Sequence, residues 1–261
     1  MLKEIFSKDN QQVKTVRALQ SRSGRKKHSL YFVEGNRITE EAVTCISSKI
    51  QFIIMNTTFK NEYPKKANEY SDKFDCYIIP DTLFKEISDT ETPQGVLAVI
   101  KNTPTPVSDF SFNDNNIIIL DSVRDPGNIG TIIRTAEAMG FNSIFLSKGC
   151  TDIYSPKVLR STMGSFFRTN IYENITLEDI NLLKEKNYKI ISTALQNDSV
   201  FLEDAPHFEK SAIVIGNEAD GISKEMLEIS DLITKIPMKG KTESLNAAIA
   251  AAIVMYHFSI D

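Results

Sequence analysis

The sequence has few of the residues that build metal centres or disulfide frameworks. It holds three cysteines and three histidines in 261 residues. Because the cysteines are widely separated and form no CxxC pair, neither a zinc ribbon nor a disulfide scaffold is indicated. The histidines are equally scattered, so we predict no metal site and interpret them as solvated or core side chains. The cysteines are Cys45, Cys76 and Cys150, and the histidines are His28, His207 and His257.

Other common signatures are also missing. Neither GxGxxG nor GxxxxGK followed by serine or threonine occurs, which argues against a dinucleotide site and a P-loop. No apolar run reaches the roughly 20 residues that a membrane-spanning helix needs, and no leader peptide is recognisable after Met1. With 41% hydrophobic and 25% charged residues, the composition is that of an ordinary globular protein. We therefore expect a cytoplasmic protein with no membrane partner.

Charge is unevenly distributed along the chain. The net charge is −4, yet residues 1–37 carry nine basic residues against three acidic ones. A basic region on an acidic body indicates a phosphate-rich partner that is contacted on one face. A solvated helical face explains the same cluster equally well. The candidate RNA-binding residues in this region are Arg17, Arg22, Arg25, Lys26 and Lys27.

Residues 1–101 alternate between helical and strand patterns and predict a compact α/β domain. A segment with two prolines and many polar residues, 102–115, follows and is interpreted as a linker. The expected helices cover residues 11–21, 37–47, 63–71 and 81–88, and the expected strands cover residues 30–34, 51–55, 75–79 and 95–100.

Residues 116–261 predict a second α/β domain with a parallel sheet. Continuous apolar runs such as Ile117–Leu120 and Ala212–Ile215 are typical of strands that are buried on both faces. The expected strands are 117–120, 143–147, 171–172, 188–194, 212–215 and 232–236. The expected helices are 131–139, 155–161, 177–186, a short helix from 223, and an alanine-rich helix after 244.

Three polar, glycine-bearing loops follow strands of this second domain, where an open parallel sheet places its ligand crevice. The first leads from Asn128 into a helix that carries Arg134, whose guanidinium needs a polar or anionic partner. The second holds Glu218, and the third holds Ser244 and Asn246. Helix capping explains Asn128 and Ser244 equally simply, a structural partner explains Arg134, and solvation explains Glu218.

Together these loops resemble the three motifs of the SPOUT-class RNA 2′-O-ribose methyltransferases, the SpoU/TrmH family. The motifs are Asn128-Ile-Gly-Thr-Ile-Ile-Arg134, Ile215-Gly-Asn-Glu218 with Gly221, and Ile236-Pro-Met238 with Ser244-Leu-Asn246. They span residues 117–256 in the family's order and spacing. Phe32-Val-Glu-Gly35 and Thr92-Pro-Gln-Gly-Val-Leu-Ala98 are similar to the family's N-terminal substrate-binding domain, although Pro93 stands where many members have histidine.

The resemblance implies a fold that composition alone does not indicate. A small ribosomal-protein-like α/β domain (1–101) would precede a parallel-sheet SPOUT domain (116–261) with a deep trefoil knot, which is a rare topology. The knot would hold S-adenosylmethionine, the methyl donor, in a bent shape. The residues implied to line its pocket are Thr193, Ala194, Leu195, Gly216, Ile236, Met238 and Leu245.

The resemblance also implies the catalytic residues Asn128, Arg134, Glu218, Ser244 and Asn246. A guanidinium holds its proton too strongly to act as an ordinary base. We therefore expect Arg134 to clamp an RNA phosphate and stabilise developing negative charge. Asn128 and Glu218 would fix Arg134 and the ribose, and Ser244 and Asn246 would bond to the substrate.

The implied partners are a structured RNA and a second copy of the chain. Ribosomal RNA is favoured over transfer RNA as the substrate, and a 23S-type ribosomal RNA is expected. The alanine-rich helix suits close packing in a homodimer, and further RNA contacts are assigned to Arg124 and Arg160. The alternative is a non-catalytic RNA-binding or ribosome-assembly factor with the same fold.

Overall fold

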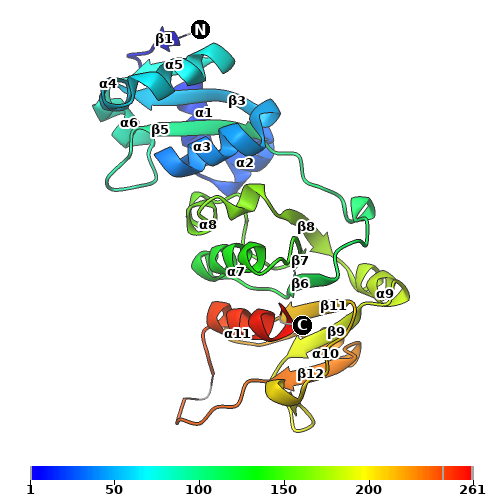
Figure 1. Ribbon diagram of the computed structural model, residues 1–261. Coiled ribbons are helices and arrows are strands. Elements are labelled where there is room, and N and C mark those ends of the chain that lie inside the picture. Colours follow the sequence, from blue (N-terminus) through cyan, green and yellow to red (C-terminus); the bar gives the residue numbers. More distant parts are fainter. Residues whose placement is uncertain (1, 243, 260–261) are drawn as a thin grey trace. The chain divides into compact units, whose positions relative to one another are not determined.

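The structure, a computed structural model, describes residues 2–242 and 244–259 and contains two compact units (Figure 1). The first unit holds the residues up to Thr103 together with Asp152–Phe167. The second unit holds Pro104–Thr151 and the residues from Arg168 onward. The sequence predicts a continuous second domain, whereas in the structure residues 152–167 pack with the first unit.

A mixed five-stranded sheet in the order β1-β4-β3-β5-β2 forms the centre of the first unit. β4 runs parallel to β1 and β3, whereas β5 is antiparallel to β3 and β2. Four strands match the predicted ranges to within one residue. β1 was not predicted, because three residues are too few to show alternation. The strands are β1 (Leu2–Glu4), β2 (Leu30–Glu34), β3 (Ile50–Asn56), β4 (Cys76–Ile79) and β5 (Val96–Lys101).

Helices cover both faces of this sheet. Successive strand residues point to opposite faces, so Phe32 of β2 packs with α1 and α6, and Val33 packs with α3 and α5. Two apolar cores therefore sandwich the sheet. The helices are α1 (Gln11–Leu19), α2 (Arg22–His28), α3 (Asn36–Cys45), α4 (Thr57–Glu62), α5 (Pro64–Lys73) and α6 (Asp81–Ile87).

The first predicted helix, 11–21, is interrupted by a turn that starts α2. The Ser21 hydroxyl accepts a hydrogen bond from the Gly24 N–H at 3.1 Å, as an N-cap residue does. A Cβ on Gly24 would lie 1.9 Å from the Ala18 carbonyl oxygen. Only glycine permits this close approach. Gly24 is therefore the residue in the sequence that indicates the break between α1 and α2.

The segment 152–167 is anchored in the first unit by a buried ion pair and by apolar packing. Arg25 donates to Asp152 at 2.7 Å and also to the Leu19 carbonyl, and its side chain is 6% exposed. Leu159 of α8 (Pro156–Ser161) is buried in the core on the α3 side, and the Tyr154 ring lies 5.1 Å from the Tyr31 ring. The prediction of Arg25 as an RNA contact is wrong, because its guanidinium is buried and bonded within the protein.

The second unit is built on a seven-stranded sheet, all parallel, in the order β10-β12-β9-β11-β6-β7-β8. Its central strands are apolar throughout, as a sheet covered on both faces requires. The predicted parallel α/β fold is confirmed. The strands are β6 (Asn116–Leu120), β7 (Ser143–Ser147), β8 (Asn170–Ile175), β9 (Lys189–Thr193), β10 (Val200–Phe201), β11 (Ser211–Ile215) and β12 (Leu232–Lys235).

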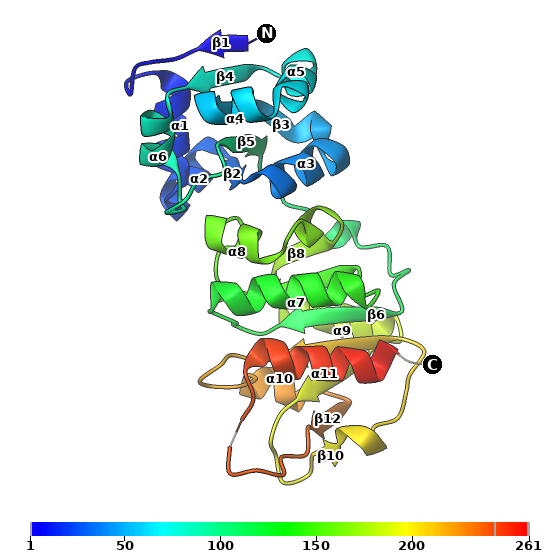
Figure 2. The same cartoon turned by 60° about the vertical axis from the view of Figure 1, so that its left-hand side comes forward.

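Helices α7 (Pro126–Ala138) and α11 (Ala247–Ser259) lie side by side on one face of this sheet (Figure 2). On the other face, α9 (Leu177–Glu185) and α10 (Lys224–Glu228) pack against alternate residues of β6 and β11. The intervening strand residues, such as Ile118 and Ile213, therefore face α7 and α11.

The predicted linker, 102–115, takes part in this packing. Phe110 is buried beneath α9, and its ring meets those of Phe145 and Tyr172 at 5.0 and 5.5 Å. Phenylalanine side chains are usually buried, so Phe110 is the residue in the sequence that argues against an unpacked linker. None of the helices in the described residues has the length and apolarity needed to cross a membrane.

Candidate functional site

A pocket of about 610 Å³ opens at the carboxyl edge of the second unit's sheet. The neighbouring strands β9, β11 and β12 end at Thr193, Ile215 and Lys235, and the residues that follow each strand line the pocket. The start of α11 closes one side. Ligand crevices lie at this edge in open parallel sheets.

All seven predicted cofactor residues line this pocket. The lining combines apolar side chains with polar ones such as Glu218 and Lys235. It includes the Thr193 hydroxyl, which is buried and has no hydrogen-bond partner among the described residues. A buried hydroxyl without a partner is costly. The seven residues are Thr193, Ala194, Leu195, Gly216, Ile236, Met238 and Leu245.

Gly216 begins a loop that folds back on itself. Asn217 and Gly221 exchange backbone hydrogen bonds of 2.8 and 3.0 Å. A Cβ on Gly216 would lie 2.4 Å from the Gly221 carbonyl carbon and 2.5 Å from the Ile222 nitrogen. Because both atoms belong to the backbone, only glycine allows the loop to close at this wall of the pocket.

A chain of side-chain hydrogen bonds joins the three predicted motifs. Asn246 Nδ2 donates to Asn128 Oδ1 at 2.9 Å, and Asn128 Nδ2 donates to Glu218 Oε1 at 2.8 Å. Glu218 also accepts from the backbone N–H groups of Arg124 and Asp125 at 3.3 and 3.2 Å. Each motif thus holds its neighbour in place beside the pocket.

Helix capping at the site differs from the prediction. Asp125, not Asn128, caps α7, because its Oδ1 accepts from the Asn128 N–H at 2.8 Å. The Asn128 side chain is therefore available for its two neighbours. At α11 the Asn246 Oδ1 accepts from the Ala248 N–H at 2.9 Å. The interpretation of Ser244 as this cap is wrong, and Ser244 instead lines the pocket.

The electrostatics of Glu218 follow from these contacts. Burial alone raises its pKa, but the hydrogen bonds from Asn128 and from backbone N–H groups outweigh burial, and the pKa lies below the ordinary value. Glu218 is therefore an anion at neutral pH whose oxygens are already engaged. This arrangement suits an anchor for the loops better than a general base.

Arg134 lies on the exposed side of α7. The structure shows no hydrogen bond or ion pair of its guanidinium with any described residue. The expected contact with Glu218 is not present, because Glu218 is bonded to Asn128 and the preceding backbone instead. Arg124 is also exposed beside this loop. Both cations are free to meet an outside ligand.

Two residues that tie the loops together were not predicted. Asn217 donates to the Ser122 carbonyl at 2.7 Å. The buried Asp121 accepts from the Ser147 hydroxyl at 3.0 Å and from the Ser223 N–H at 2.8 Å. Asp121 follows the buried strand β6, and Asn217 lies in the loop after the buried strand β11. Polar residues at the ends of such strands often line a ligand crevice, so this position could have identified both.

The other predicted RNA contacts belong to the first unit and differ in availability. Arg22, Lys26 and Lys27 are exposed. Arg17 pairs with Glu86, and Arg160 pairs with Asp89 at 2.7 Å. Among the described residues, no group of three His, Cys, Asp or Glu side chains could hold a metal ion.

Comparison with known proteins identifies both parts of the chain. Residues 115–256 match the SpoU rRNA Methylase family, and residues 10–98 match the MRM3-like substrate binding domain. A Bacillus subtilis (strain 168) relative, the 23S rRNA (guanosine(2553)-2′-O)-methyltransferase RlmP, is 33% identical over 98% of this chain and 99% of its own. Mitochondrial rRNA methyltransferase 3 of Homo sapiens is 26% identical over 91% of this chain and 69% of its own.

A solved structure agrees with these matches. The S-adenosylmethionine-bound rRNA methyltransferase of Sinorhizobium meliloti superposes with a TM-score of 0.86 at 28% identity, covering 98% of this chain and 97% of that one. The family model covers more than half of the chain, and hydrogen bonds from Asn128 join the three motifs beside the pocket. The chain therefore belongs to the SpoU rRNA methylase family.

Proposed function

We propose that this protein transfers a methyl group from S-adenosylmethionine to a ribose 2′-hydroxyl of ribosomal RNA. The observation that carries the proposal is the chain of bonds Asn246–Asn128–Glu218, which ties the first motif to the two motifs that line the pocket. The 23S rRNA specificity in the name of the Bacillus subtilis relative supports ribosomal over transfer RNA.

The pocket fits the methyl donor. Its volume of about 610 Å³ lies in the range of small-molecule sites. Apolar side chains such as Leu195, Ile236 and Met238 suit an adenine ring, and the unpaired Thr193 hydroxyl offers a hydrogen bond to a polar ligand group. When bound, the donor supplies an electrophilic methyl group on a sulfonium.

The residues around the pocket position the ribose. Asn128 and Glu218 hold the first two loops together, and Asn246 holds the start of α11 against them. Ser244, which lines the pocket, and Asn246 bond to the substrate side of the transfer. Such positioning lowers the barrier when the attacking hydroxyl must lie in line with the methyl group.

Arg134 acts on the RNA rather than on the loops. Its guanidinium is exposed and has no partner among the described residues, which leaves all five N–H donors for a phosphate. In this role Arg134 clamps the nucleotide and stabilises the negative charge that develops on the 2′ oxygen. The proton leaves to phosphate or water. Arg124 is a second contact for the RNA backbone.

The first unit binds structured RNA. Its match to a substrate-binding domain and its exposed cations Arg22, Lys26 and Lys27 support this role. A helical RNA is held mainly through phosphates and shape, and the target nucleotide leaves its stack to reach the donor. The cytoplasm, where ribosomal RNA of bacterial relatives is made, is the proposed location.

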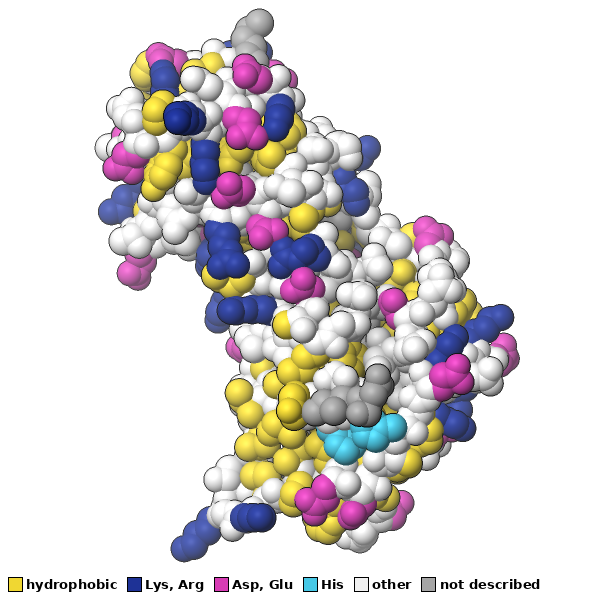
Figure 3. Space-filling view, in the orientation of Figure 1, with side chains coloured by type: hydrophobic (Ala, Val, Ile, Leu, Met, Phe, Trp, Pro, Cys, Tyr) yellow, Lys and Arg dark blue, Asp and Glu magenta, His cyan; other side chains and the backbone are white. Residues whose placement is uncertain are grey.

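A homodimer forms through α11. Ile249, Ile253 and Tyr256 are 52%, 38% and 60% exposed, and their spacing places them on one side of the helix. Figure 3 shows hydrophobic side chains gathered over this part of the second unit. An exposed apolar patch of this kind is typical of an interface. The trefoil knot that the family resemblance implies is part of the same proposal.

Calorimetric titration with S-adenosylmethionine tests the function. Binding heat at micromolar donor is expected. A protein that gives no heat at high micromolar donor, yet still binds RNA, would instead be a non-catalytic RNA-binding or assembly factor. Mass-spectrometric mapping of ribose methylation in RNA from cells that lack the protein then identifies the nucleotide.

A further inference from the structure

A second pocket, of about 280 Å³, lies entirely within the first unit. Three stretches form its walls: the start of α3, the segment 90–94, and the end of α8 with the turn that follows it. None of the residues in these walls belongs to the methyl-donor pocket. Its volume lies just below the range of about 300 to 1,000 Å³ for small-molecule sites, which suits a single nucleobase rather than a whole cofactor.

The walls are held in place by a buried carboxylate. Glu34, at the end of β2, is 6% exposed and accepts hydrogen bonds from the Ser88 hydroxyl, the Asp89 N–H and the Thr90 hydroxyl at 2.5, 2.9 and 2.7 Å. These three donors engage both carboxylate oxygens and fix the loop at 88–90. The pocket is therefore formed before any ligand arrives.

A second bond fixes the opposite wall. Gln94 Oε1 accepts from the Asn36 N–H at 2.7 Å, which holds the segment 90–94 against the first turn of α3. Its amide NH₂ group remains a donor for a ligand, because only the oxygen is engaged in this bond.

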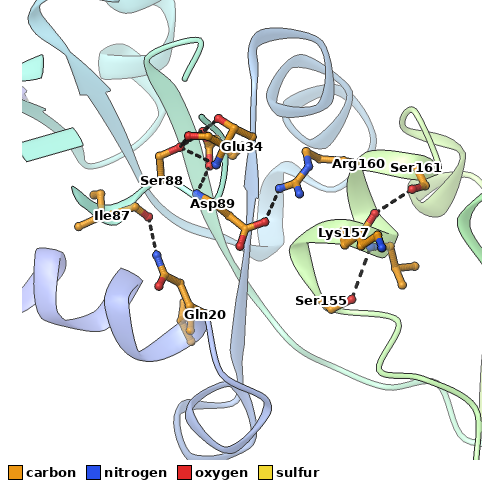
Figure 4. A network of polar contacts seen from close by, with 12 residues as sticks. Gln20, Glu34, Ile87, Ser88, Asp89, Ser155, Lys157, Arg160 and Ser161 are labelled. Atoms are coloured by element: carbon orange, nitrogen blue, oxygen red, sulfur yellow. Dashed lines mark hydrogen bonds and ion pairs between the residues drawn. The ribbon is translucent and has the colours of Figure 1, made fainter. Parts of the chain in front are cut away.

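Two guanidinium groups line the pocket. Arg160 reaches from α8 to Asp89, to which it donates at 2.7 Å, close to the group formed by Glu34 and Ser88 (Figure 4). Arg37, in the first turn of α3, is exposed and has no partner among the described residues. Most N–H donors of both arginines therefore remain available to a ligand.

The remaining lining is apolar. Ile38 is buried, whereas Met163 is 38% exposed. Met163 has a φ of 52°, in the left-handed region that residues other than glycine seldom occupy. Backbone strain of this kind collects at functional sites, and here it holds a polarizable side chain at the pocket.

We propose that this pocket binds an unpaired nucleotide of the RNA substrate, outside the site of methyl transfer. Met163 and a guanidinium plane contact the face of the base, the Gln94 amide and the Thr92 hydroxyl bond to its edge, and Arg37 binds a phosphate. Proteins read RNA sequence mainly through unstacked bases held in this way. The proposal rests on the function proposed above and adds a source of sequence preference to it.

The test measures binding of a 23S rRNA fragment that contains guanosine 2553 over a range of KCl concentrations. Arg37→Ala is expected to weaken binding about tenfold and to reduce the salt slope by about 0.7 to 0.9, the value for one lost phosphate contact. Met163→Ala is expected to weaken binding several-fold with an unchanged slope, because no charge is lost. Neither residue makes a hydrogen bond through its side chain, so both variants should fold.

Lys65→Ala is the matched control, since Lys65 is an exposed cation of the same unit outside the pocket. If Arg37→Ala and Met163→Ala bind the RNA as Lys65→Ala does, the second nucleotide site is refuted while the proposed function stands. A wild-type protein that binds donor but no RNA would defeat both proposals.

Discussion

At the scale of single residues, the structure separates cations that stabilise the fold from cations that can meet RNA. Arg25 and Lys26 are adjacent in the sequence and were predicted to share one role. In the structure the Arg25 side chain is 6% exposed and bonded to Asp152, whereas Lys26 is exposed. The sequence carries no signal for this difference, because Asp152 lies more than 100 residues away in the chain.

Replacing Arg25 should therefore destabilise the first unit. Arg25→Ala leaves the Asp152 carboxylate, which is 14% exposed, with only the Tyr154 N–H as a partner. Losing one member of a buried ion pair costs about 3 to 5 kcal/mol. Chemical denaturation measures this change in the free energy of unfolding. Lys26→Ala is the control and should lie within about 0.5 kcal/mol of the wild type. Equal stability of the two variants would show that the ion pair is not needed.

Glu218 predicts a pH dependence of the donor pocket. Its folded pKa lies below the ordinary value of 4.5, so its stabilising contribution is complete above that value and is lost as the pH falls through the folded pKa. Donor affinity of the wild type should therefore fall in acid below about pH 4.5 as Glu218 takes up a proton. Glu218→Gln should bind donor more weakly at neutral pH and should lack this acid transition. An identical acid profile in the variant would exclude Glu218 as the cause.

At the scale of elements, periodicity located most helices and strands but not their ends. The run 131–139 was recognised as a helix, yet α7 begins at Pro126, because Asp125 caps it and proline is favoured in a first turn. This earlier start places Asn128 on the helix, facing Glu218 and Asn246. The motif residues could be identified from the sequence, whereas their bonding partners depended on tertiary contacts that no local pattern encodes.

The closure of the loop at 216–221 provides a test at this scale. Gly216→Ala would place a Cβ 2.4 Å from the Gly221 carbonyl carbon, so the loop must open at the pocket wall. We expect donor binding to weaken about tenfold or more, equivalent to about 1.4 kcal/mol. Gly240→Ala is the control, since its added Cβ meets nothing within 4 Å. Calorimetric titration compares the two, and equal donor affinity would contradict the role of Gly216.

At the scale of the whole molecule, the sequence predicted two α/β domains and the family but not the path of the chain between units. Residues 152–167 connect β7 and β8 of the second unit and nevertheless pack with the first. Their apolar residues could equally have served a core of the second unit. Their partners in the structure, among them Arg25, Tyr31 and Asp89, reveal which core they join.

The proposed dimer can be tested on α11. Ile253→Asp introduces a charge into the exposed apolar face, and burying an unpaired charge in an interface is strongly unfavourable. We expect the variant to sediment as a monomer and the wild type as a dimer in analytical ultracentrifugation. Leu177→Asp is the control, because Leu177 is 43% exposed on α9, on the other face of the sheet. A wild-type monomer, or a dimer that survives Ile253→Asp, would rule out this interface.

The proposal that donor, ribose and the Arg134 guanidinium meet at one site is tested most directly by following a labelled methyl group. Single-turnover transfer to 23S rRNA is measured for the wild type and for Arg134→Ala, with donor affinity determined in parallel. The wild type should place the label on a ribose 2′ oxygen, whereas Arg134→Ala should bind donor to within about twofold and transfer none. Wild-type transfer rates in the variant, or label on a base, would contradict the proposed chemistry.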